Sequence, residues 1–127
     1  SLCKELLNSL EPTRNISLNE NYCDVEVTIN KAIPIGLIIN EAVTNSIKHA
    51  FPIGHANPEI NIRIKKKEKE IMLIIGDNGK GIGKSTPLEN EKTLGISLIH
   101  SLTEQIDGQL VFLNGTGTKI RISFNLN

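Results

Sequence analysis

The chain has 127 residues, of which 39% are hydrophobic and 22% charged, and this length and composition predict one globular domain with a substantial core. Fourteen basic and fourteen acidic residues cancel to a net charge of zero, and three Phe and one Tyr are the only aromatic residues, so we expect no nucleic-acid partner. No apolar run approaches the roughly 18 residues that span a bilayer, so we expect no direct membrane contact by this domain.

The N-terminal residues predict a short amphipathic helix. Leucines spaced four apart (Leu2, Leu6 and Leu10) lie before Pro12, which ends the periodic pattern. We interpret residues 1–12 as the remnant of a preceding region, and residues 13–127 as the domain itself. Cys3 and Cys23 lack the spacing of a metal site, which favours free thiols and a cytoplasmic location.

A strand and a long helix are expected next. Polar and apolar residues alternate from Asp24 to Asn30, which predicts a strand with one buried face. Pro34 suits the first turn of a helix, so we expect a helix from about Ile35 to Ala50 that stops before Pro52.

The second half of the chain predicts two hairpins separated by a helix. The segment "EINIRIKKKEKEIMLII" contains two strands joined by a charged turn at Lys67–Lys69. The polar residues 84–92 lack a clear period and are expected to form a flap. The segment "LGISLIHSLTEQID" then predicts a helix with Leu98, Ile99, Leu102 and Ile106 on one face, stopped by Gly108. The final strands are expected to turn around Asn114–Gly117.

This order of elements predicts the fold class. Strands paired through short turns, with helices between them, indicate an α+β fold in two layers. We therefore expect a mixed, mostly antiparallel sheet that helices cover on one face.

The glycine-rich stretch "IIGDNGKGIGKS" directly follows a predicted strand and resembles a phosphate-binding loop. A P-loop would need Gly where Asn78 stands and a helix immediately afterwards, but Pro87 and a polar stretch follow. A dinucleotide-binding loop would need Gly where Lys84 stands. The spacing therefore argues against both of these nucleotide folds.

What remains is the pattern D-x-G-x-G-x-G, formed by Asp77, Gly79, Gly81 and Gly83. A carboxylate at the end of a buried strand needs a partner, and it can accept a hydrogen bond from an exocyclic amine such as that of adenine. A plain Asp-Asn-Gly turn explains the same residues, so both interpretations stay open at this point.

The helix "GLIINEAVTNSIKHAF" carries a second set of polar residues. At 100° per residue, one arc of about 100° holds four of them: Glu41, Asn45, Lys48 and His49. The opposite side holds Ile39, Val43, Ile47 and Ala50. Glu41 and Asn45 are hard oxygen ligands one turn apart that suit Mg²⁺, and a lysine can contact phosphate. A solvated helix face remains the alternative.

Four segments together resemble the motifs of the Bergerat-fold ATPases, which include DNA gyrase B, the ninety-kilodalton heat-shock chaperone, histidine kinases and MutL. These segments are "NEAVTNSIKHAF", "DNGKGIG", "TLGISLI" and "GTGTKIRISF", and they occur in the family's order. Within this superfamily, the chain is most similar to the ATP-binding catalytic domain of sensor histidine kinases, in the HisKA_2 or HWE-like subgroup.

The resemblance implies a role for each matching residue. Asp77 would accept the adenine amine, Gly81 would line the base, and Thr118 would reach the adenine pocket through water. Asn45 would coordinate Mg²⁺, and Glu41 would bind the metal through water or polarise an attacking group. The remaining implied contacts to ATP come from Lys48, His49, Gly79, Ile82, Gly83, Thr93, Leu94 and Gly95, with residues 80–94 as the ATP lid.

The resemblance also implies the reaction and its partners. The domain would transfer the γ-phosphoryl group of ATP to a histidine on a separate dimerisation domain, and a response regulator would receive it afterwards. None of His49, His55 and His100 has the setting of an acceptor, so we expect this chain to bind ATP without autophosphorylating. An anti-sigma-factor-type serine kinase and a nucleotide-binding pseudo-enzyme are the alternatives.

Overall fold

The computed structural model describes residues 16–51, 57–79, 94–113 and 117–126. The described elements follow one another as β1 (Ser17–Tyr22), α2 (Ile29–Asn45), the π-helical turn η1 (Ser46–Ala50), β2 (Glu59–Lys67), β3 (Glu70–Asp77), α4 (Leu94–Gln105), β4 (Gln109–Leu113) and β5 (Lys119–Asn125). The predicted N-terminal helix, the lid and the tip of the last hairpin lie outside the described residues.

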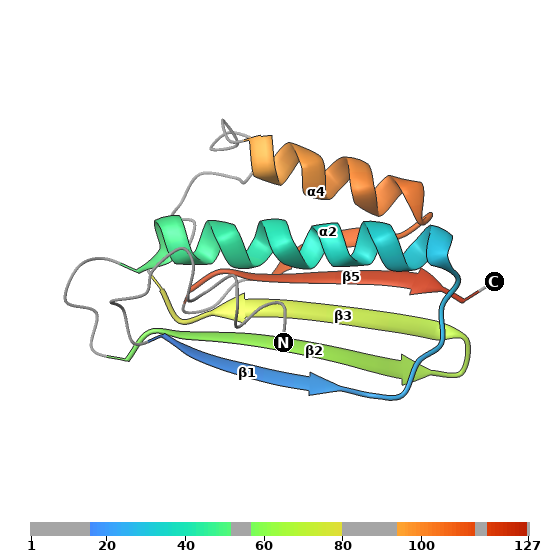
Figure 1. Cartoon of the computed structure of the whole chain (residues 1–127), viewed down its shortest axis with the longest axis horizontal. Coiled ribbons are helices and arrows are strands. Elements are labelled where there is room, and N and C mark those ends of the chain that lie inside the picture. Colours follow the sequence, from blue (N-terminus) through green and yellow to red (C-terminus); the bar gives the residue numbers. More distant parts are fainter. Residues whose placement is uncertain (1–15, 52–56, 80–93, 114–116, 127) are drawn as a thin grey trace.

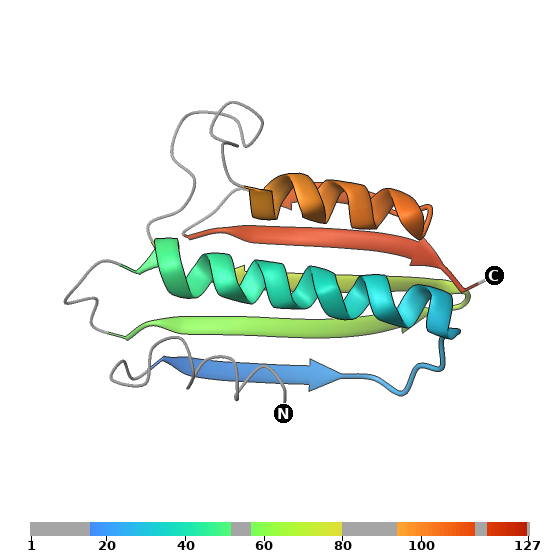
Figure 2. The same ribbon diagram turned by 45° about the horizontal axis from the view of Figure 1, so that its top comes forward.

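The strands form one five-stranded sheet in the order β1-β2-β3-β5-β4. β1 runs parallel to β2, and the other neighbouring strands are antiparallel. Figures 1 and 2 show α2 and α4 side by side on one face of this sheet. The predicted fold class, a mixed sheet covered on one face by helices, is therefore confirmed.

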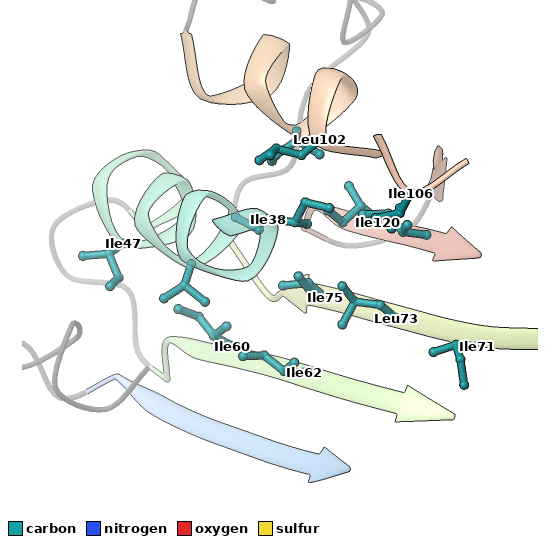
Figure 3. Packing of buried hydrophobic residues seen from close by; sticks show 14 of the residues in the cluster. Ile38, Ile47, Ile60, Ile62, Ile71, Leu73, Ile75, Leu102, Ile106 and Ile120 are labelled. Carbon is teal, nitrogen blue, oxygen red and sulfur yellow. The ribbon is translucent and has the colours of Figure 1, made fainter. Parts of the chain in front are cut away.

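The core lies between the helices and the sheet and consists mainly of isoleucine. Alternate residues of β3 point into it, namely Ile71, Leu73 and Ile75, while Ile38 and Ile47 enter from α2 and η1 (Figure 3). Each such side chain stabilises the fold by about 1.5–3 kcal/mol relative to an exposed position. This core fixes the register of the strands, because a slip by one residue would turn the isoleucines toward solvent.

The strand predicted at residues 24–30 is wrong. Residues 24–28 form no strand, and α2 begins at Ile29. Val25 and Val27 pack partly against the core, which explains the alternation that suggested a strand. The first strand is instead β1, whose polar sequence SLNENY lacks the apolar alternation that predicts a strand. Asn19 Nδ2 on β1 donates hydrogen bonds to Glu59 and Asn61 on β2.

The predicted start of the long helix is also wrong, since Pro34 lies inside α2 rather than in its first turn. Lys31 N and Ala32 N both donate to the Thr28 carbonyl, so the helix is already formed before the proline. Pro34 removes one backbone hydrogen bond at this point, and its burial within the core offsets part of that loss.

The two predicted hairpins and the second helix are confirmed. β2 and β3 are joined by a tight turn in which Glu68 has φ of 58°, and α4 ends before Gly108. Ile99 and Leu102 are buried on the predicted face of α4, and Ile106 is buried directly after its last residue. α4 packs along α2, so Gly95 at the start of α4 lies near the predicted site residues of α2.

Candidate functional site

Asp77, the last residue of β3, is a buried carboxylate with 7% of its surface exposed. Its Oδ2 accepts a hydrogen bond from Ser46 Oγ at 2.7 Å. Its Oδ1 accepts hydrogen bonds from the backbone N–H groups of Gly79 at 2.9 Å and Thr118 at 3.1 Å. A carboxylate has about four acceptor positions, so this group is held in one orientation and can still accept another donor.

Ser46 is a partner that the sequence analysis missed. It directly follows Asn45 where α2 passes into η1, and only 8% of its surface is exposed. In the sequence, Ser46 is a hydroxyl residue on the otherwise apolar, core-facing side of the helix. A buried hydroxyl needs a hydrogen-bonding partner, so this position indicated that one was present.

We expect Ser46→Ala to lower the free energy of unfolding by about 1–2 kcal/mol, since the change leaves Asp77 Oδ2 short of a donor inside the protein. Urea denaturation would measure the difference. Ser101→Ala, at an exposed position on α4, is the matched control and should change stability by less than about 0.5 kcal/mol. Equal effects of the two substitutions would contradict the role given to Ser46.

The Asp-Asn-Gly turn is present, and it coexists with an available carboxylate. The bond from Gly79 N to Asp77 Oδ1 is the side-chain bond of an Asx turn. Asn78 accepts from Glu59 N and donates to the Asn57 carbonyl, both at 2.7 Å, and thereby fixes the loop to the start of β2. The turn therefore positions Asp77 without using all of its acceptor positions.

Gly117 shapes the other side of Asp77. It has φ of 81°, and a Cβ built there would lie 2.0 Å from the Asp77 carbonyl oxygen. The backbone can approach this closely only without a side chain. Next to it, Thr118 bonds Asp77 twice, since its carbonyl also accepts from Asp77 N at 2.8 Å. From the sequence, Gly117 was expected only in a turn and as part of the motif "GTGTKIRISF".

A second group of residues lies where α4 begins against the C-terminal part of α2. A Cβ built on Gly95 would be 3.0 Å from both Asn45 Oδ1 and Nδ2, and 3.1 Å from Glu41 Oε2. Gly95 therefore brings the first turn of α4 close to the two predicted metal ligands. Glu41 and Asn45 are half-buried, and Lys48 is exposed.

The two groups are adjacent, because Asn45 and Ser46 are consecutive residues. The structure thus brings together six predicted site residues: Glu41, Asn45, Asp77, Gly79, Gly95 and Thr118. Gly81, Ile82, Gly83 and Thr93 lie outside the described residues, as do the side chains of His49 and Leu94.

The donor set at this site fits a partly exposed cation better than a closed metal centre. Within the described residues, no three His, Cys, Asp or Glu side chains gather in a group that could hold a metal ion. Mg²⁺ commonly takes only one or two protein ligands and completes its shell with water and phosphate oxygens.

Among the described segments, no helix is long and apolar enough to cross a membrane.

Comparison with known proteins identifies similar chains. The sequence model of the family described as "Histidine kinase-, DNA gyrase B-, and HSP90-like ATPase" matches residues 30–127. Blue-light-activated histidine kinase 2 of Erythrobacter litoralis is 28% identical over 123 residues, which are 95% of this chain and 35% of that protein. The sensor histidine kinase PdtaS of Mycobacterium tuberculosis is 28% identical over 82 residues, 64% of this chain and 16% of that protein.

A solved structure agrees with these matches. The histidine kinase domain of the Erythrobacter litoralis EL346 blue-light-activated kinase superposes with a TM-score of 0.83 at 27% identity, over 96% of this chain and 57% of that chain. This chain spans 35% of the length of the Erythrobacter litoralis relative and 16% of the length of PdtaS.

Proposed function

Because the chain belongs to the family of histidine kinase-, DNA gyrase B- and HSP90-like ATPases, we propose that it binds Mg-ATP and provides the catalytic step of a sensor histidine kinase. The two curated relatives named above are histidine kinases, which supports a kinase-type transferase. The observation that carries the proposal is the Asp77 carboxylate, which three donors hold in place while an acceptor position stays available.

In this proposal, Asp77 recognises adenine by accepting its exocyclic amine. The residues fit that role because the carboxylate is buried, fixed and flanked by the glycine position that allows close backbone approach. Guanine carries a carbonyl oxygen at the corresponding place, and two acceptors facing each other repel. The site therefore selects adenine over guanine.

Asn45 and Glu41 would hold Mg²⁺, which neutralises charge on the triphosphate when bound. Both side chains are half-buried beside Gly95, which supports this role. Gly95 lies in the first turn of α4, where backbone N–H groups are available to bind phosphate. Lys48, exposed one turn further on, would contact phosphate. The roles of His49, Gly79, Gly81, Ile82, Gly83, Thr93, Leu94 and Thr118 along the nucleotide are part of the same proposal.

The phosphoryl acceptor would be a histidine on a dimerisation domain of the HisKA_2 or HWE-like type, and a response regulator would act downstream. We expect the chain alone to bind ATP without labelling itself. The relatives named above favour this function over an anti-sigma-factor-type serine kinase.

We expect Asn45→Ala to abolish the Mg²⁺-dependent part of ATP binding and to leave adenosine binding unchanged. In the parent chain, Mg²⁺ should strengthen binding of a non-hydrolysable ATP analogue about 10-fold or more, since it links the phosphates to Asn45. Isothermal titration of the analogue with and without Mg²⁺, and of adenosine alone, separates the two contributions.

Asn30→Ala, an exposed position on the same helix, is the matched control and should behave like the parent. Failure of the parent chain to bind the analogue at all would overturn the proposed function. An unchanged Mg²⁺ effect in Asn45→Ala would leave nucleotide binding standing and remove Asn45 as a metal ligand.

A further inference from the structure

The second face of the sheet, which we name the open face, is covered by neither α2 nor α4 (Figure 2). It carries the strand residues that alternate with the core positions. Five of them are cationic: Arg63, Lys65, Lys67, Lys119 and Arg121. The chain as a whole has zero net charge, so these cations are gathered rather than spread over the surface.

Strand pairing places the cations around an apolar centre. Ile74 on β3 lies between Arg63 on β2 and Arg121 on β5, and Arg121 in turn pairs with Val111 on β4. Ile74 is half-buried, and 38% of Val111 is exposed. An apolar centre within a charged rim is the usual arrangement of a protein interface.

The open face is also hollowed. In the neighbouring row, Asn61 and Lys119 flank Gly76, which has no side chain to fill the space between them. A cavity of about 600 Å³ lies here, and its lining includes Arg63 and Lys119 as well as the acidic residues Glu20 and Asp77.

These cations lack acidic partners within the described part of the chain. No ion pair involves Arg63, Lys65, Lys119 or Arg121 in residues 16–51, 57–79, 94–113 and 117–126. The acidic residues of this face, Glu59 and Glu70, lie at strand ends, and Glu59 already accepts a hydrogen bond from Asn19. The strand positions of this face therefore carry five cations against two acidic residues.

We propose that the open face is a docking surface for an acidic segment of a protein, whose carboxylates pair with the cations on β2 and β5. Five strands about 4.8 Å apart and about 25 Å long give roughly 600 Å², close to one side of a small specific interface. The positive charge of the face favours a negatively charged partner. The apolar centre favours a protein over a nucleic acid, since binding of a nucleic acid would need aromatic side chains or many more basic ones on this face. The hollow borders the proposed nucleotide site, because Asp77 belongs to the lining of the one and to the other.

The probe is hexaglutamate, titrated into the ¹⁵N-labelled chain at low salt and followed by amide chemical shifts. We expect shifts at residues 61–63, 74–76 and 119–121, which weaken as salt is added. Arg63→Glu should reduce the affinity at least about fivefold, because one favourable charge pair becomes repulsive. Lys119→Glu, on a different strand, should give the same loss and keeps the test valid if one variant fails to fold.

Lys66→Glu is the matched control, because it makes the same charge change at an exposed residue of the same strand that points to the opposite side. It should alter the affinity less than about twofold if the effect is local rather than one of net charge. The proposal is overturned if hexaglutamate shifts no amide of the open face, or if Lys66→Glu weakens binding as much as Arg63→Glu. Binding of phosphatidylserine vesicles through Arg63 without binding of the peptide would also overturn it.

Discussion

Asp77→Asn is expected to weaken binding of an ATP analogue at least about 100-fold while the chain stays folded. The new Asn Oδ1 can still accept from Gly79 N and Thr118 N, and the Ser46 hydroxyl can rotate to accept from the new amide. The substitution thus retains the local hydrogen bonds but places a donor where the adenine amine needs an acceptor. Isothermal titration would measure the affinity, and circular dichroism the fold.

The chain offers a matched control for this experiment. Asp107, just after α4, is exposed and has φ of 53°, a backbone conformation that Asn adopts readily. Asp107→Asn makes the same chemical change away from the site and should bind the analogue like the parent. Retention of full affinity by Asp77→Asn would remove Asp77 as the adenine acceptor.

Local sequence was sufficient to predict the parts of the site that depend on spacing along one segment. Glu41 and Asn45 are one helical turn apart, and Asp77 ends an apolar strand, so their approximate positions follow from periodicity. The resemblance then implied that these segments meet, and in the structure Ser46, next to Asn45, bonds Asp77 while Gly95 lies close to Glu41 and Asn45. Their chemical roles are still proposals.

The features that the sequence analysis missed depend on contacts between distant segments. β1 has no apolar alternation, and its strand conformation depends on parallel pairing with residues about 40 positions later. Residues 24–30 have the alternation without a neighbouring strand to pair with. Ser46 and Gly117 matter because of Asp77, which is 31 and 40 positions away from them, respectively. No pattern within one segment of the sequence indicates contacts between residues so far apart.

Gly117→Ala is expected to lower the free energy of unfolding by more than about 3 kcal/mol and the melting temperature by about 10 °C. The added Cβ would lie 2.0 Å from the Asp77 carbonyl oxygen and 2.8 Å from its carbon, and φ of 81° is itself unfavourable for alanine. The backbone at Asp77 or at the start of β5 must then shift. Since Thr118 N holds the Asp77 carboxylate, nucleotide affinity should fall together with stability.

Gly36→Ala makes the same change where nothing lies within 4 Å of the added Cβ, on the exposed side of α2. There alanine should stabilise the chain by about 0.5–1 kcal/mol, because glycine is the poorer helix former. Opposite signs in the two variants would show that the close backbone approach at Asp77, rather than loss of a glycine, causes the damage. If Gly117→Ala melted like the parent, Asp77 and Gly117 would not make this close contact, and the site would need another way of holding its carboxylate.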